Sequence, residues 1–140
     1  HHPKLLILDE PTSGLDPVVR EDILDLFLDF VSDEEHTILL STHITSDLER
    51  ISDKIIFIDN GKIYLNDNKD DILENYGILK CDSKEFEKLD KKDYISYKKN
   101  KYNYEVLVSD KKKMKKKYKN FIIDNITLDE LMVLIIKGEK

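Results

Sequence analysis

The first half of the chain contains two short apolar runs, at residues 4–8 and 37–41, in which polar and apolar positions do not alternate. An unbroken apolar run indicates a strand buried on both faces, as in a parallel sheet. A segment with helical periodicity lies between the two runs. Strand, helix and strand in this order predict a βαβ unit with a right-handed crossover. We therefore expect an α/β fold with parallel core strands.

The helix between these strands has a clear predicted start. Asp16 is a good N-cap, and Pro17 suits the first helical position. The pattern continues to about Ser32, with acidic residues on the outward side. The apolar face is expected to consist of Val19, Ile23, Leu26, Phe27 and Phe30.

A hairpin is the clearest element after the second strand. The apolar runs at 54–58 and 62–65 flank Asn60-Gly61, a dipeptide that tolerates the positive φ angles of a tight turn. Short helices are predicted before it, at 46–51, and after it, at 70–76.

The remaining residues predict a small α+β module. The alternation from Tyr102 to Val108 indicates a half-buried strand, and a charged helix is expected at 110–119. A short strand follows at 121–123. Thr127 and Glu130 form a capping-box pattern at the start of a final apolar helix.

The distribution of charge also divides the chain, near residue 76. The net charge is −6, but residues 1–75 carry 18 acidic and 6 basic side chains, whereas residues 76–140 carry 11 and 17. Such an asymmetry indicates two modules with different surfaces. With Gly77 as the boundary, we predict two domains, 1–76 and 77–140.

Composition excludes several classes of protein. With 40% hydrophobic and 37% charged residues, the chain is typical of soluble globular proteins. No apolar run approaches the roughly 18–20 residues of a membrane-spanning helix. The single cysteine, Cys81, excludes an intrachain disulfide and fits a reducing compartment, and we expect it to be a small packing residue.

Asp9 and Glu10 directly follow the first apolar run. In parallel α/β sheets, ligands bind beyond the carboxyl ends of the strands, and carboxylates there suit a hard cation such as Mg²⁺. Acidic residues also follow many strands simply because a charged side chain is well hydrated at the surface. The dipeptide alone does not separate these two interpretations.

The residues around this pair are far more specific. Residues 5–16 read Leu-Leu-Ile-Leu-Asp-Glu-Pro-Thr-Ser-Gly-Leu-Asp, which resembles the Walker B motif and D-loop of the ATP-binding-cassette (ABC) ATPases, the motor subunits of ABC transporters. Ser41-Thr42-His43 resembles that family's switch histidine in type, order and spacing. The resemblance covers about residues 3–75 and implies the C-terminal part of a P-loop NTPase fold.

The resemblance implies a role for each matched residue. Asp9 would hold Mg²⁺ through water, Glu10 would polarise the attacking water, and His43 would contact the γ-phosphate of ATP. The D-loop, which in this family contacts a second ATP-binding subunit, would consist of Ser13, Gly14, Leu15 and Asp16.

Three parts of the family's nucleotide site have no counterpart here: the Gly-rich phosphate loop, the glutamine lid and the Ser-Gly-Gly signature loop. The four glycines are scattered and cannot form a phosphate nest. These parts precede Walker B in the family, so we expect the chain to be the C-terminal part of an ATPase subunit. We expect it alone neither to bind ATP appreciably nor to hydrolyse it.

Residues 77–140 are more loosely similar to the accessory C-terminal domains of bacterial drug and peptide exporters with separate membrane subunits. This similarity implies a membrane permease as partner, export as the direction, and a cytoplasmic position at the inner face of the cell membrane. The Lys-rich stretch 111–119 could contact nucleic-acid phosphates or anionic lipid, but a solvated helix face is the interpretation that we favour. We expect no nucleic-acid partner.

Two other functions are compatible with the sequence. An ABC-type ATPase could act on nucleic acid or ribosomes, although the D-loop sequence favours a transporter. A truncated, non-catalytic cassette could instead bind a partner cassette through its D-loop.

Overall fold

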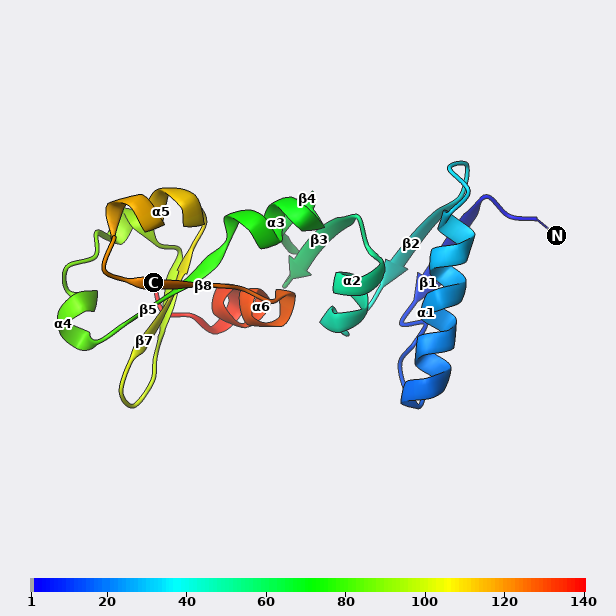
Figure 1. The fold of residues 1–140 in the computed structure, drawn as a ribbon. Coiled ribbons are helices and arrows are strands. Elements are labelled where there is room, and N and C mark those ends of the chain that lie inside the picture. Colours follow the sequence, from blue (N-terminus) through cyan, green and yellow to red (C-terminus); the bar gives the residue numbers. More distant parts are fainter. Residues whose placement is uncertain (1) are drawn as a thin grey trace. The chain divides into compact units, whose positions relative to one another are not determined.

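The computed structural model describes residues 2–140, which fall into two compact units (Figure 1). The first unit ends at Ser52, and the second spans Asp53–Lys140. The hairpin therefore packs with the C-terminal part of the chain. The predicted domains, 1–76 and 77–140, stay a prediction. No helix within residues 2–140 is both long and apolar enough to cross a membrane.

The first unit is a βαβ unit followed by a short helix. Its strands pair in parallel, with Leu5 opposite Thr37 and Asp9 opposite Ser41, which confirms the predicted pairing. The register matters for function, because it brings the residues that follow each strand to one edge of the sheet. The elements of this unit are β1 (Leu5–Asp9), α1 (Pro17–Val31), β2 (Thr37–Ser41) and α2 (Thr45–Ile51).

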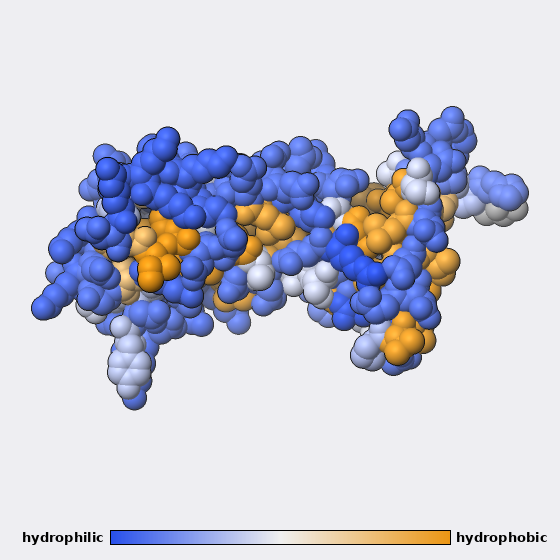
Figure 2. All heavy atoms as spheres, in the orientation of Figure 1, coloured by the Kyte–Doolittle hydropathy of each residue, from blue (hydrophilic) through white to orange (hydrophobic). Residues whose placement is uncertain are grey.

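The expectation that both strands are buried on both faces is wrong. The side chains of Leu5, Ile7 and Leu39 are 53%, 71% and 58% exposed. Alternate residues of a strand point to opposite faces, and among the described residues α1 and α2 cover only one face, around Leu40. The other face is open to solvent, and Figure 2 shows apolar side chains reaching the surface of this unit.

Helix α1 begins as predicted. The Asp16 carboxylate accepts hydrogen bonds from the backbone N–H groups of Val18 and Val19, at 3.1 and 3.2 Å. The predicted apolar face is partly wrong, because Leu24 is the buried residue whereas Val19 and Leu26 are exposed. Only the side of α1 that meets the sheet and α2 is covered in this unit.

The second unit begins with the predicted hairpin, β3 (Lys54–Asp59) and β4 (Lys62–Asn68). Asn60 and Gly61 have φ angles of 47° and 72°, which confirms a turn in the left-handed region. The helix α3 (Lys69–Asn75) follows.

A four-stranded antiparallel sheet forms the centre of this unit. The strand order of the sheet is β6-β7-β5-β8. Together with its helices, the sheet makes the second unit an α+β structure. The strands are β5 (Gly77–Cys81), β6 (Ser96–Lys99), β7 (Tyr104–Val108) and β8 (Ile122–Asn125). The helices are α4 (Ser83–Phe86), the 3-10 helix η1 (Lys91–Asp93), α5 (Lys111–Lys117) and α6 (Leu128–Lys137).

The core of this unit lies against the sheet. The prediction of a half-buried strand near Val108 is wrong, because Val106, Leu107 and Val108 are all buried. A central strand covered on both faces buries consecutive residues. The capping box at the start of α6 is confirmed, since Thr127 and Glu130 bond reciprocally. The buried cluster on one face of the sheet consists of Leu79, Cys81, Val106, Val108, Met114 and Ile123.

The Lys-rich helix α5 is not simply a solvated face. Lys111 is buried, and its Nζ donates to the carbonyl of Leu73 at 3.3 Å and to Asn125 Oδ1 at 2.7 Å. Burial lowers the pKa of this lysine. Lys112 forms an ion pair with Glu74 of α3. Part of the basic charge therefore attaches α5 to the helix that follows the hairpin.

Cys81 is buried, as expected, and should be nearly inert in the folded chain. Its side chain is 5% exposed, and burial, assisted by the charges of Glu85 and Asp82, raises the pKa of the thiol to about 11. Because the thiolate is the reactive form, a chromogenic disulfide reagent at pH 8 should react about a hundredfold more slowly with the folded than with the urea-unfolded chain. Equal rates in the two states would contradict this.

Candidate functional site

The candidate site lies where the two parallel strands of the first unit end. Asp9 and Ser41 are the last residues of β1 and β2 and are register partners. The pairing extends one residue further, because the backbone N–H of Glu10 donates to the carbonyl of Ser41 at 2.8 Å. This pairing sets the residues after β1 beside those after β2.

Glu10 faces the segment after β2. Its Oε1 accepts hydrogen bonds from the His43 backbone N–H at 3.1 Å and from His43 Nδ1 at 2.9 Å. Its Oε2 accepts from the Thr42 hydroxyl at 3.2 Å. An ionised carboxylate can only accept, so the hydrogen bond places a proton on Nδ1 of the imidazole. These bonds, chiefly the one from the His43 side chain, lower the pKa of Glu10.

The backbone at Glu10 is unusual. Its φ angle is 46°, in the left-handed region that residues other than glycine rarely adopt. The chain therefore turns sharply as it leaves β1. Strain of this kind persists only where the surroundings hold it, and it is frequent at functional sites.

Asp9 points to different partners. Its Oδ1 accepts a hydrogen bond from the Ser41 hydroxyl, and its side chain is exposed. The two adjacent acids therefore face separate positions, as their predicted separate roles require. Those roles stay predictions.

The residues around Asp9 offer a cation few protein ligands. Within residues 2–140, no cluster of three or more His, Cys, Asp or Glu side chains could enclose a metal ion. The Asp9 carboxylate and the Ser41 hydroxyl supply oxygens at one position. This donor set fits Mg²⁺, which keeps several waters and commonly takes only one or two protein carboxylates beside a phosphate ligand.

The predicted D-loop forms an exposed turn before α1. Ser13, Gly14, Leu15 and Asp16 are all exposed. Gly14 has a φ angle of 76° with open space around it, so backbone conformation and not crowding favours glycine there. The Asp16 carboxylate caps α1, and contact of the D-loop with a second subunit stays a prediction.

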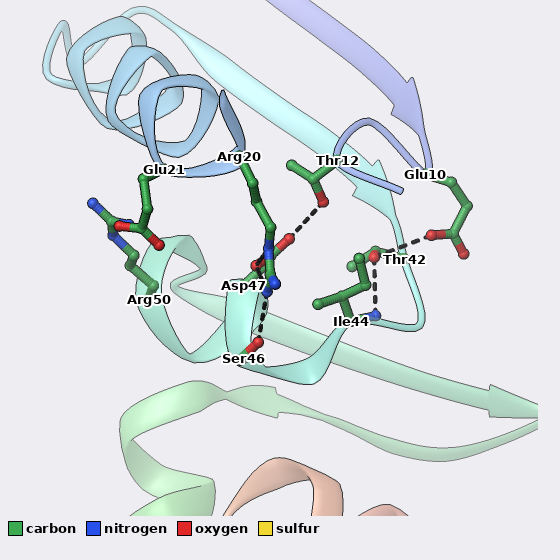
Figure 3. A network of polar contacts seen from close by, with 9 residues as sticks. All are labelled: Glu10, Thr12, Arg20, Glu21, Thr42, Ile44, Ser46, Asp47 and Arg50. Atoms are coloured by element: carbon green, nitrogen blue, oxygen red, sulfur yellow. Dashed lines mark hydrogen bonds and ion pairs between the residues drawn. The ribbon is translucent and has the colours of Figure 1, made fainter. Parts of the chain in front are cut away.

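Three polar residues of this region were not predicted from the sequence. Thr12 and Asp47 are each 2% exposed, and Arg20 of α1 reaches both Asp47 and Ser46 (Figure 3). Asp47 lies near the start of the predicted helix at 46–51 and Arg20 in the predicted helix that begins at Pro17, but no motif marks either residue. Only the packing of α1 against α2 shows that they meet.

Comparison with known proteins relates about half of the chain to one family. No protein-family model matches the sequence. The chain is 42% identical over 78 residues to a putative ABC transporter ATP-binding protein of Pyrococcus horikoshii, a match that covers 56% of this chain and 28% of that protein. It is 48% identical over 68 residues to a lantibiotic transport ATP-binding protein of Streptococcus pyogenes, covering 49% and 29%.

A third relative is a thiamine import ATP-binding protein of Chelativorans, 41% identical over 59 residues, with 42% of this chain and 24% of that protein covered. The chain thus spans about a quarter of the length of these relatives. About half of the chain is homologous to ABC transporter ATP-binding proteins, which confirms the predicted resemblance. The mixed α/β structure is compatible with the C-terminal part of that ATPase fold.

Proposed function

We propose that the first half of the chain supplies the hydrolytic part of an ATP site in the ATP-binding subunit of an ABC transporter. One observation carries this proposal. The Glu10 carboxylate lies at the ends of two parallel strands and is held by both the backbone and the imidazole of His43. Homology to ABC transporter ATP-binding proteins supports the same assignment.

Each residue of the site has a proposed task. Asp9, with Ser41 beside it, would hold Mg²⁺ through water, and the ion would supply positive charge against the phosphates of ATP. Glu10 would accept a hydrogen bond from the attacking water and polarise it. This task requires the ionised carboxylate, and the hydrogen bonds from His43 and Thr42, which lower the pKa of Glu10, favour that form. His43 would contact the γ-phosphate.

The chain alone would not complete the site. Its sequence has no Gly-rich loop ending in Lys-Ser or Lys-Thr, so no backbone cradle is available for the phosphates. We propose that hydrolysis needs a cradle supplied by additional polypeptide. The proposed partners are a second ATP-binding subunit at the D-loop and a membrane permease at the inner face of the membrane.

Export is the proposed direction of transport, and it rests only on the similarity of residues 77–140 to exporter accessory domains. The relatives' names do not decide it. One is a lantibiotic transport protein and another a thiamine import protein.

A fusion protein tests this function. The N-terminal part of the streptococcal relative, which should supply the phosphate loop, is joined ahead of this chain. We expect Mg²⁺-dependent ATP hydrolysis by the fusion and none by the 140-residue chain. Phosphate release is measured for both. A folded fusion that binds ATP but does not hydrolyse it would contradict the proposal and favour a non-catalytic interaction module. Hydrolysis by the chain alone would show that no added cradle is needed.

A further inference from the structure

A buried carboxylate connects three elements near the candidate site. Asp47, in the first turn of α2, uses both of its oxygens. Oδ2 accepts a hydrogen bond from the Thr12 hydroxyl at 2.5 Å, and Oδ1 accepts from Arg20 Nε at 2.7 Å and also from Arg20 Nη2. Figure 3 shows Thr12, from the turn after β1, and Arg20, from α1, converging on this side chain.

The burial of Asp47 requires these partners, because a buried charge is unfavourable unless it is paired and hydrogen-bonded. Asp47 and Thr12 are almost completely buried, and the described residues leave no buried side-chain polar atom without a partner. Arg20 also donates from Nη2 to the Ser46 hydroxyl at 2.7 Å, which fixes the guanidinium against the start of α2. The turn after β1, α1 and α2 are thus held in one mutual geometry.

Both ends of this connection lie close to the candidate site. Thr12 comes two residues after Glu10, and the intervening turn is closed by a hydrogen bond from the Ser13 N–H to the Glu10 carbonyl at 3.2 Å. On the other side, α2 begins two residues after His43. Thr42 connects this segment to Glu10, since its hydroxyl accepts from the Ile44 N–H at 3.0 Å and donates to the Glu10 carboxylate.

We propose that Asp47 is a positioning residue that, through Thr12, holds the strained turn at Glu10 against the segment carrying His43. Asp47 contacts neither acid of the site. It acts by fixing the distance between two loops, so that the Glu10 carboxylate meets the backbone N–H of His43. This inference rests on the proposed function for its biological meaning, but the geometry that it predicts does not require nucleotide.

The test measures amide hydrogen exchange of the 140-residue chain by NMR, in the absence of nucleotide. The His43 N–H is the reporter, because its hydrogen bond to Glu10 forms only when the two loops are in place. Thr12→Val removes the hydroxyl and keeps the shape of the side chain. We expect this change to accelerate exchange at His43 by about tenfold, as loss of a hydrogen bond does. Asp47→Asn should act in the same direction.

Thr12→Ser is the matched control, because it keeps the hydroxyl and should leave exchange at His43 slow. The amides that pair β1 with β2 should keep their protection in all three variants. Unchanged exchange at His43 in Thr12→Val, or an equal loss of protection at His43 and throughout β2, would overturn the proposal. If Asp47→Asn fails to fold, the two Thr12 variants decide. Failure of the fusion to hydrolyse ATP would leave this result unaffected.

Discussion

Replacement of Glu10 by Gln should lower the rate of ATP hydrolysis by the fusion protein by about 10²–10⁴-fold, the usual contribution of a positioned general base. Gln keeps the size of the side chain and can still accept from the His43 N–H, but it loses the negative charge that is proposed to polarise water. Because Glu10 is not part of the phosphate cradle, ATP binding should be retained. The effect should therefore fall on kcat and not on KM. Phosphate release at saturating Mg²⁺-ATP measures it.

Glu34→Gln is the matched control. Glu34 is exposed in the same unit and precedes β2, and the same loss of one charge there should leave hydrolysis unchanged. A Glu10→Gln fusion with a kcat close to that of the unsubstituted fusion would contradict the role of Glu10. It would leave the homology intact and require another base.

The largest effect on stability should come from the core of the second unit. Leu79 is 1% exposed and belongs to the buried cluster on one face of the antiparallel sheet. Leu79→Ala removes buried methyl groups and leaves a cavity, so it should lower the free energy of unfolding of this unit by about 2–5 kcal/mol. Urea denaturation followed by tyrosine fluorescence measures the change. The seven tyrosines all lie in the second unit and the chain has no tryptophan, so the fluorescence reports this unit.

Ile122→Ala provides the comparison within the same sheet. Ile122 precedes Ile123, the register partner of Leu79, but its own side chain is 66% exposed. Its replacement should cost less than about 1 kcal/mol, as is usual for exposed positions. Similar losses at both positions would show that the cluster is not the core that the burial indicates.

Elements with strong local chemistry could be predicted from the sequence. The Asn60-Gly61 turn and the Thr127 capping box depend on residues a few positions apart, and both are present. The strands β5 and β6 could not be found in this way. Gly77–Cys81 begins with a glycine and its short apolar run is interrupted by Lys80, and Ser96–Lys99 is largely polar, so neither has a clear strand pattern. They become strands because they pair with β7, which is a long-range effect.

The residues of the candidate site also differ in whether they could be predicted from the sequence. Asp9, Glu10 and His43 could be proposed because acids and a histidine follow strands that must end at one edge. Asp47 could not, since its partners Thr12 and Arg20 lie 35 and 27 residues away in sequence. The exposure of β1 and β2 could not be predicted for a related reason. An apolar run shows that a strand can be covered on two faces, whereas the described residues cover only one.

The left-handed backbone at Glu10 also has a consequence for selection. Glycine is the residue that would relax this φ angle most, yet glycine has no carboxylate. Selection for a relaxed backbone alone would therefore favour a residue that has no group to polarise water. Under the proposed function, relief of backbone strain and activation of water would therefore favour different residues at this position.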